Sequence, residues 1–566
     1  MALTTPSQSP AVSVREIDLT GVVPNVQSST GAFVGDFNWG PVDQIVRVSN
    51  ESDLRSKFGT PEKSNAVDFF SAAYFLKYSS SLLVVRVDGG MNAAATSDHQ
   101  PIELTPAVPA TYVVDSDGTQ VLDSDGQPIE LTPAVPATYA PAARLIKNSD
   151  VWDLGVTGSD NTVYAKYPGS LGNSIKVTLI PAGVQSSIFD DAPEAGEVHV
   201  IVSDAEGKIT GVKGDILETF AFMSTTPGST NEQGGANYVT DVINNQSSWI
   251  WMGEYTEGWT FDSDGTWSAT LEGGSDEAVS TQAKGSAFSL FEDPDTVTVD
   301  FLIAPQDVDA DVVTTIAEIR RDCVAVASPA RLSVVGNADP TAAIIASAPS
   351  TRSSYTILDN NFFKVYDKYN DQYIFIPAAS STAGVMAAAD LASAPWFSPA
   401  GERRGRYLGV TDVAYNPSKA QRDDLYAAGI NPVANIPGSG VLLYGDKTYQ
   451  RRPSAFDRIN VRRLFLVLER AIGQAGKNVM FEMNDEFTRA EFVNIVEPLL
   501  REVQGRRGIT DFRVVCDETN NTPAVIDRNE FVASIFIKPA RSINYVTLNF
   551  VAVRTGVSFE EVVGLV

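Results

Sequence analysis

The sequence is poor in the residues that carry most acid–base and metal chemistry. Its 566 residues include only two histidines and two cysteines, at His99, His199, Cys323 and Cys516. Two cysteines exclude a disulfide scaffold and a cysteine-based zinc site, and two histidines leave little for general acid–base catalysis or metal binding. We therefore expect a protein that is not an enzyme and that holds no cofactor and no metal ion.

Sequence motifs that bind phosphates or activate a nucleophile are also missing. No GxGxxG motif follows a predicted strand, and neither HExxH nor GxSxG occurs. The nearest approach to a phosphate loop, residues 473–478 (GQAGKN), lacks the upstream glycine and the hydroxyl residue after its lysine. His199 lies in an apolar run and is predicted to be an ordinary strand residue. A carboxylate pair for glycoside chemistry stays open, although dispersed acids usually form solvated surface.

Long apolar runs and basic charge are scarce as well. No stretch approaches the roughly 18–20 apolar residues that span a bilayer, and residues 1–20 lack the basic and apolar regions of a signal peptide. The net charge is −28, from 70 acidic and 42 basic residues. This charge disfavours nucleic acids and anionic membranes as partners, because both are bound mainly through Lys and Arg. We expect a soluble protein, made and initially kept in a cytoplasm.

Charge is distributed unevenly along the chain. Residues 88–290 contain 28 acidic and 7 basic side chains, whereas residues 401–566 contain 20 acidic and 22 basic side chains. A chain of this length is expected to form several domains, and such a change of charge marks a domain boundary. Short apolar runs at 175–179, 198–202 and 249–252 predict that the acidic segment forms one or two inserted β-rich domains.

The acidic segment contains an internal duplication. The sequence QPIELTPAVPATY occurs at 100–112 and again at 127–139, and DSDG occurs at 115–118, 123–126 and 262–265. The DSDG spacing does not match a calcium-binding EF-hand loop, and Asp-Gly turns between short strands explain it better. Two copies are too few for a solenoid, which indicates a local duplication in a tolerant surface region.

Helices and strands alternate in the C-terminal third. Apolar residues at helical spacing predict one helix over 456–472, and a second helix that follows a capping-box pattern at 488–491 and ends near Gly505. Strand-like runs between and after these helices imply an α/β or α+β domain with helices packed on a sheet. These runs are 479–481, 512–516 and 531–537.

A cluster of arginines stands out in this acidic protein. It is open to two interpretations: a solvated helix face with local ion pairs to Asp457 and Glu469, or a contact surface for an acidic partner. The cluster consists of Arg451, Arg452, Arg458, Arg462 and Arg463.

Both ends of the sequence have extended character. Residues 10–19 and 543–554 show strand-like alternation, and the second segment is apolar on both of its faces. A strand of that kind must be covered, so it either packs in its own domain or adds to a sheet of a neighbouring copy. The candidate inter-subunit residues are Val12, Val14 and Ile17 in the first segment and Ile543, Tyr545, Val546, Leu548, Phe550, Val551 and Val553 in the second.

Motifs in several parts of the chain carry a family resemblance. The most specific are residues 383–385 (AGV) with 394–401 (APWFSPAG), and residues 515–522 (VCDETNNT). On these residues the sequence resembles the tail sheath proteins of contractile-tailed bacteriophages over about three-fifths of its length. The other stretches that match are 31–41, 48–59, 69–78, 83–87, 299–305, 322–329 and 429–432.

The resemblance implies a structural subunit of the virion tail, assembled in the host cytoplasm as stacked hexameric rings around a tail tube. Its expected partners are further copies of the chain, the tail tube protein, and baseplate and tail terminator proteins, with no nucleic acid and no membrane insertion. It also implies that the terminal arms donate strands to neighbouring subunits and that contraction is a switch between two packings of folded domains. We take Arg451, Arg452 and Arg458 as candidates for contact with the tube.

The resemblance also implies a fold and its division. We expect an α+β multidomain protein with a C-terminal α/β core of helices on a mixed sheet, β-rich inserted outer domains and extended terminal arms. The expected segments are an N-terminal arm (1–28), the first part of the sheath core (29–87), the acidic insert (88–290), a middle domain (291–410), the C-terminal α/β core (411–540) and a strand-donating arm (541–566).

Two alternatives remain open at this stage. The first is the sheath of a tail-derived bacteriocin or another contractile injection system, against which the large acidic insert weakly favours a phage. The insert by itself also permits a β-rich carbohydrate-binding or hydrolytic surface protein, although no residue in it identifies a sugar site.

Overall fold

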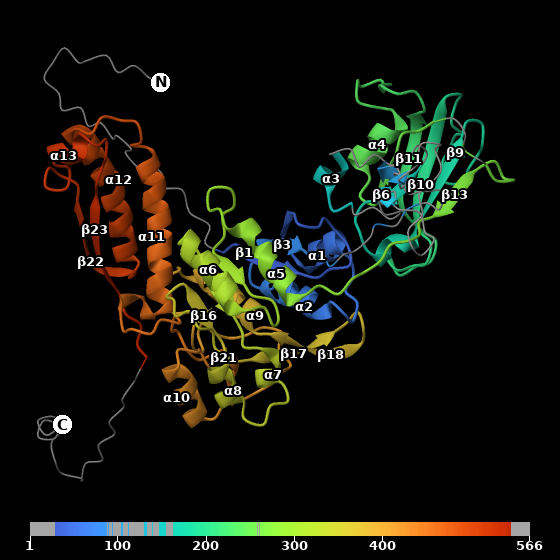
Figure 1. Cartoon of the computed structure of the whole chain (residues 1–566). Coiled ribbons are helices and arrows are strands. Elements are labelled where there is room, and N and C mark those ends of the chain that lie inside the picture. The colour runs from blue at the N-terminus through green and yellow to red at the C-terminus, as the bar shows by residue number, and fades with distance from the viewer. Residues whose placement is uncertain are drawn as a thin grey trace, which may run out of the picture. The chain divides into compact units, whose positions relative to one another are not determined.

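The computed structural model describes residues 29–87, 146–153, 162–256 and 261–544, with residues 89, 93, 95 and 259 and four short strands between 103 and 139. Contacts divide the chain into two compact units (Figure 1). The smaller unit contains residues 393–398 and the chain from Arg458 onward, and the larger unit contains residues 27–392 and 399–457. In the described part of the chain, every helix is too short or too polar to cross a membrane.

The larger unit is built on a six-stranded mixed sheet with the order β16-β15-β14-β1-β3-β2. All neighbouring strands are parallel except β2, which is antiparallel to β3. The strands are short apolar runs, as expected where helices cover both faces of a sheet. More than 200 residues separate β3 from β14, yet both pair with β1. The strands are β1 (Gly31–Gly35), β2 (Ile45–Val48), β3 (Leu82–Arg86), β14 (Phe301–Ile303), β15 (Val324–Ala327) and β16 (Thr356–Leu358).

Helices pack on both faces of this sheet. Val34 of β1 belongs to one buried cluster with Val313 of α6, against which Ala283 of α5 also packs. On the opposite face, the ring of Phe301 in β14 contacts Phe75 of α2, and α9 packs against α2. The helices on one face are α5 (Thr281–Ala287) and α6 (Ala310–Arg320), and those on the other are α2 (Ala66–Phe75) and α9 (Ala379–Ala392). A further helix, α1 (Glu51–Phe58), lies between β2 and α2 in the sequence.

The rest of the larger unit outside the acidic segment consists of short elements around these layers. A three-stranded antiparallel sheet has the order β18-β17-β19, and β20 pairs with β21. The elements are α7 (Arg331–Val334), α8 (Pro340–Ala346), β17 (Phe362–Asp367), β18 (Gln372–Pro377), β19 (Asp412–Val413), α10 (Lys419–Ala427), β20 (Val433–Ile436) and β21 (Gly440–Leu443).

The acidic segment folds around a four-stranded antiparallel sheet with the order β11-β10-β9-β13. The three strands predicted at 175–179, 198–202 and 249–252 are confirmed as β9, β10 and β12. The DSDG sequence at 262–265 forms a turn before β13, with the Gly265 N–H donating to the Asp262 carbonyl. The elements are α3 (Ser149–Asp153), β8 (Val163–Ala165), β9 (Ile175–Pro181), β10 (Glu197–Asp204), β11 (Asp215–Ser224), α4 (Val239–Gln246), β12 (Ile250–Met252) and β13 (Trp267–Thr270).

His199 is a buried strand residue, as predicted. It lies in β10, and its ring packs against the rings of Phe189 and Phe222. Its Nδ1 accepts a hydrogen bond from the Phe222 backbone N–H at 2.9 Å. The side chain therefore has a structural explanation in the packing of this sheet.

Trp39, in the loop after β1, belongs to the core of the acidic segment. It is 2% exposed and lies in one buried cluster with Val177, Val200 and Ile250. Its ring centroid lies 5.1 Å from that of Trp249 and 5.4 Å from that of Tyr167. The loop that follows the central strand thus completes the core of a sheet formed by residues far along the chain.

The smaller unit is a helical pair packed on a two-stranded antiparallel sheet (Figure 1). Its two predicted helices and the strands near 512–516 and 531–537 are confirmed. The predicted strand at 479–481 is wrong: these residues form a turn, and Gly473 and Gly476 lie inside the preceding helix. The elements are α11 (Ile459–Lys477), α12 (Glu486–Gly505), β22 (Ile509–Val515), α13 (Pro523–Ile526) and β23 (Ser534–Pro539).

The start of α12 differs from the capping box predicted at 488–491. The cap is Asp485, whose side chain accepts a hydrogen bond from the Thr488 N–H at 2.8 Å. Thr488 therefore lies inside the first turn of the helix. Asp485 also places a negative charge at the helix N-terminus, where the helix dipole favours it.

Candidate assembly interface

The β22–β23 sheet has one buried face and one exposed face. Phe512 and Ile537 on the inner face pack in a core with Phe492, Val496 and Leu500 of α12. On the outer face, Lys538 and Asp511 form a salt bridge of 2.9 Å, and the ring of Phe536 is 60% exposed. Helices cover one face of this sheet. Further strands can add at its edges, where the backbone groups of an edge strand are unpaired.

The two strands of this sheet each have an outer edge that pairs with no other strand among the described residues. Within the described residues, the sheet has only two strands, paired from Val515↔Ser534 to Ile509↔Pro539. An isolated two-stranded sheet is marginally stable, and this one is stabilised by its packing on α12. The outer edge of each strand presents backbone N–H and C=O groups along its length.

Asn521 holds the connection between the two strands in place. It is 1% exposed, and its side chain donates to the Val532 carbonyl at 2.8 Å and accepts from the Val532 N–H at 2.9 Å. This paired contact fixes the chain as it enters β23. Asn521 lies in the VCDETNNT motif, but sequence reasoning assigned it no role, because a buried amide cannot be told from a surface one without its partners.

The predicted arms fall largely outside the described residues. Of these positions only Ile543 is described, and its side chain is 84% exposed. The described chain passes from β23 through Ala540, whose N–H donates to the Gly508 carbonyl at 3.0 Å. The positions outside the described residues are Val12, Val14, Ile17, Tyr545, Val546, Leu548, Phe550, Val551 and Val553.

The five arginines of the predicted cluster differ in burial and belong to two different units. Arg451 and Arg452 are exposed and belong to the larger unit, whereas Arg458 is half-buried and precedes α11 in the smaller unit. Arg462 and Arg463 are buried, with 7% and 5% exposure, so a solvated helix face that includes them is wrong. Arg462 acts within the fold instead, because its charge opposes the rise that burial causes in the pKa of Glu469.

An exposed apolar turn between α11 and α12 was not anticipated from the sequence. Phe481 is fully exposed and has a φ of 70°, and Met483 and Phe487 are 78% and 77% exposed. The turn is anchored by Asn484, whose amide donates to the Glu530 carbonyl at 2.8 Å. The apolar residues 479–481 predict a strand, and only their exposure in the structure distinguishes an apolar turn from a strand.

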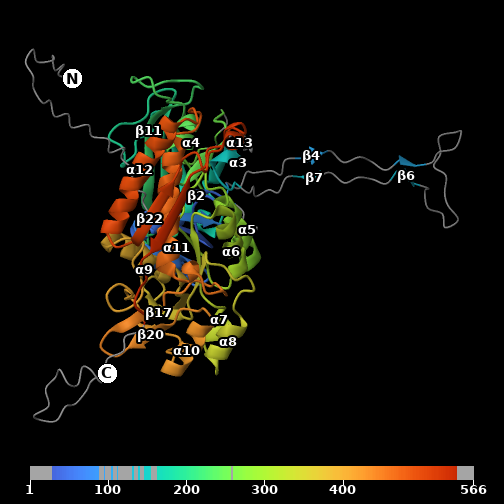
Figure 2. The same cartoon turned by 90° about the vertical axis from the view of Figure 1, so that its left-hand side faces the viewer.

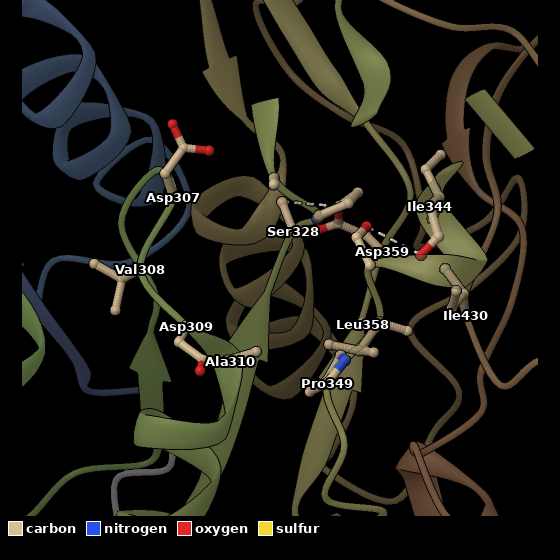
Figure 3. A pocket seen from close by; sticks show the side chains of 14 residues that line it. Asp307, Val308, Asp309, Ala310, Ser328, Ile344, Pro349, Leu358, Asp359 and Ile430 are labelled. Carbon is tan, nitrogen blue, oxygen red and sulfur yellow. Dashed lines mark hydrogen bonds between the residues drawn. The ribbon is translucent and has the colours of Figure 1, made fainter. Parts of the chain in front are cut away.

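The larger unit contains a cavity of about 120 Å³ at the carboxyl ends of β14, β15 and β16 (Figure 3). Ser328 follows β15 and Asp359 follows β16, and the Ser328 hydroxyl donates to the Asp359 carboxylate at 2.8 Å. Thr382 donates to the other carboxylate oxygen at 3.2 Å. Burial raises the pKa of Asp359 to about 7, so this carboxyl retains its proton well above the usual range.

Neither of the two cysteines has the character of a nucleophile. Burial raises the pKa of the Cys323 thiol far above its usual range and raises that of Cys516, which disfavours the thiolates that act as nucleophiles. Among the residues that the structure describes, no group of three or more His, Cys, Asp or Glu side chains is placed to hold a metal ion.

Family models match most of the chain. The model of the phage tail sheath protein central domain matches residues 285–449, and that of the phage tail sheath C-terminal domain matches residues 451–552. A third model, for the N-terminal region of domain III of the tail sheath protein Gp18, matches residues 29–87.

Relatives and solved structures agree with these models. The chain is 32% identical to the tail sheath protein of Vibrio phage KVP40, covering 98% of this chain and 99% of the relative, and 31% identical to that of Enterobacteria phage T4, with the same coverage. The fold is similar to the sheath tail protein of Listeria innocua, with a TM-score of 0.53 and 14% identity over 91% of this chain and 96% of the other. That of Desulfitobacterium hafniense has a TM-score of 0.51 and 16% identity over 94% and 100%.

These structural neighbours confirm the expected α+β fold class. The mixed sheet, however, belongs to the larger unit, and the expected mixed sheet of the C-terminal core is wrong, because the sheet described in the smaller unit has two antiparallel strands. The sequence matches span nearly the full length of this chain and of its relatives. This protein is therefore a tail sheath subunit and belongs to the phage tail sheath protein family.

Proposed function

We propose that this sheath subunit polymerises as stacked hexameric rings around a tail tube and contracts to drive the tube through the host envelope during genome delivery. The observation that carries the proposal is the β22–β23 sheet, which has two strands and two available edges within the described residues. A lattice of identical subunits needs a repeated contact of this kind, in which one surface of a subunit fits a different surface of the next.

The terminal segments are the proposed donors for these edges. Residues 10–19 and 543–554 have the alternating apolar pattern of strands. Each hydrogen bond of an added strand contributes about 0.5–1.5 kcal/mol net. A strand of roughly ten residues therefore links neighbouring subunits firmly, while the folded units that it joins remain free to change their packing.

Contraction is proposed to be a change in the packing of folded units rather than a chemical reaction. The chain has two compact units with separate cores, which suits a rearrangement between two packed states. The energy is stored when the sheath assembles in an extended, metastable form, so no nucleotide hydrolysis and no other catalysis is needed.

The acidic segment is proposed to face outward. It contributes −21 of the net charge of −28 within residues 88–290. Repeated at high density around a tube, such charge keeps a large polymer soluble and opposes lateral bundling. The nearly neutral region from residue 401 onward is then left for contacts among subunits and with the tube, and the ends of the sheath for baseplate and tail terminator proteins.

Arg451, Arg452 and Arg458 are proposed to register the sheath on the tube. We expect the double variant R451E/R452E to slow tube-templated assembly at low ionic strength and to weaken its dependence on salt, because exposed charges act through screened electrostatic attraction. Turbidity and electron microscopy over a series of salt concentrations measure both effects.

A matched control for the arginine variant is R501E/R528E. Arg501 and Arg528 are exposed and form surface ion pairs with Glu497 and Glu530, so the control makes the same change of net charge elsewhere. Assembly rates and salt dependence that are equal to wild type in R451E/R452E would show that these two residues do not guide the sheath onto the tube.

Electron microscopy of the purified chain mixed with its tube protein tests the proposed function. We expect long hollow sheaths with sixfold symmetry around the tube. Dispersed monomers under all conditions would contradict the proposed polymerisation around the tube. Electron microscopy of the native particles then separates the two kinds of sheath, because tails without a genome-filled head would indicate a tail-derived bacteriocin or another contractile injection system.

A further inference from the structure

The duplicated segment of the acidic insert pairs with its own copy. β4 (Glu103–Thr105) and β5 (Thr111–Tyr112) come from the first copy of QPIELTPAVPATY, and β6 (Glu130–Thr132) and β7 (Thr138–Tyr139) come from the second. β4 pairs with β7, and β5 pairs with β6, both antiparallel. Figure 2 shows β4 and β7 side by side. The two copies therefore lie against each other in opposite directions.

The register of this pairing is symmetric between the two copies. In the backbone register Glu103 is paired with Tyr139, and Glu130 is paired with Tyr112, so each glutamate position is paired with the tyrosine position of the other copy. The threonines behave in the same way, because Thr105 lies opposite Thr138 and Thr111 lies opposite Thr132. Exchanging the copies leaves every one of these pairs unchanged.

Even the irregularity of the ladder is repeated. The register shifts by one residue between Glu103 and Thr105 in one pair of strands, and between Glu130 and Thr132 in the other. The extra residues are Leu104 and Leu131, which occupy the same place in the two copies. The pairing is thus a local twofold arrangement of two identical segments, including its bulge.

We propose that this duplicated segment is a clasp between subunits, in which the first copy of one subunit pairs with the second copy of a neighbouring subunit. The occupant is a second molecule of this chain, because only the same sequence offers the same strands, the same bulge and the same opposite residues. The proposal rests on the polymerisation proposed above, which brings many copies of the segment close together.

The free energies of the two arrangements support this exchange. Pairing within one chain and pairing between chains form the same backbone hydrogen bonds and the same cross-strand pairs, so they differ mainly in the entropy of closing the connection at residues 113–129. The entropic cost of closing a loop rises only slowly with its length. Polymerisation raises the local concentration of the segment above that of free subunits, and exchange of identical elements is a low-cost route to association.

The shortness of the strands also favours exchange. Each paired strand has two or three residues, and a two-stranded ladder of this kind is marginally stable by itself. The prolines of the repeat, at Pro106, Pro109, Pro133 and Pro136, cannot donate to a ladder. A ladder of such short strands opens readily, and a second copy of the same sequence carries its prolines at the same positions.

Single-cysteine variants distinguish pairing between subunits from pairing within one. Sheaths are assembled from a mixture of T111C chains and T132C chains, oxidised and separated by non-reducing electrophoresis. Residues directly opposite in an antiparallel pair lie within reach of a disulfide, and a bond in this mixture joins different chains by design. The natural thiols contribute little background, because Cys323 and Cys516 are both buried.

We expect a band of covalent dimers in the assembled T111C and T132C mixture. A mixture of T111C with T138C is the control, because these positions are equivalent in the two copies and never lie opposite each other in this register. The double variant T111C/T132C reports pairing within one chain through faster migration of the monomer.

The outcomes separate this inference from the proposed function. If sheaths form by electron microscopy and the only cross-link is the internal one of the double variant, the clasp is refuted while polymerisation stands. If no sheath forms under any condition, the proposed function itself fails. Dimers in the T111C and T132C mixture, absent from the control mixture, support the clasp.

Discussion

Removal of residues 541–566 is expected to abolish sheath polymerisation while leaving a folded monomer. The cut follows Ala540, whose N–H donates to the Gly508 carbonyl and closes the end of the β22–β23 sheet. The core between this sheet and α12, which includes Phe492 and Leu500, lies entirely before the cut. The truncation therefore removes the proposed donor strand and leaves its proposed acceptor intact.

The effect is expected to be large because the lost contact recurs in every subunit. A strand of about ten hydrogen bonds, each worth about 0.5–1.5 kcal/mol net, accounts for most of the stability of one link. Electron microscopy and sedimentation at concentrations at which wild type forms sheaths measure the loss. Circular dichroism of the truncated monomer checks that it is folded.

A shorter truncation is the matched control. Removing residues 557–566 leaves the whole predicted strand at 543–554, and this variant is expected to polymerise like wild type. Sheaths formed by the 541–566 deletion would refute strand donation by the C-terminal arm. Failure of both truncations with a folded monomer would assign the essential contact to the last ten residues instead.

Substitution of Trp39 by alanine is expected to destabilise the β-rich insert by about 3–5 kcal/mol, the usual cost of removing a buried tryptophan side chain. Trp39 contacts Trp249 and Tyr167 and lies in the insert's own core cluster, although it comes from the loop after β1. The loss is expected to be local, because the cluster of the six-stranded sheet is a separate one.

Hydrogen exchange measured by mass spectrometry tests this prediction region by region. We expect amides in β9 and β10 to exchange at least about a hundredfold faster in Trp39→Ala, and amides in α12 to be unaffected. Phe261→Ala is the control, since Phe261 lies in the same insert but is 39% exposed, and it is expected to have little effect. Unchanged protection of β9 and β10 would show that Trp39 is not part of the insert's stability.

Local patterns account for the parts of the fold that were predicted correctly. The spacing of Val461, Leu464 and Leu468 predicts a helix, and these three side chains are buried on α11. The spacing of Phe492, Val496 and Leu500 does the same for α12. An amphipathic helix is encoded within a few turns of chain, so its existence is readable without knowing what it packs against.

Errors arose where a local pattern had two physical explanations. Residues 479–481 have the composition of a strand, but no strand pairs with them in the described residues, and Phe481 is fully exposed. Arg462 and Arg463 have the composition of a solvated face, but both are buried. In each case the segments that pack against a residue decide whether it forms a strand or a turn, or whether it is exposed or buried. A short window of sequence does not show which segments these are.

The sequence by itself determined the class of protein: the scarcity of His and Cys, the acidic insert, the two long helices and the motifs of the sheath family are all properties of composition or of short windows. Only the tertiary structure decided that β1 pairs with β14, that Trp39 completes the core of the insert, that Arg462 is buried and that the repeat pairs with its own copy. The physical reason is distance along the chain. Periodicity records which side of an element is apolar, whereas contacts between segments far apart depend on which surfaces meet when the chain closes in space.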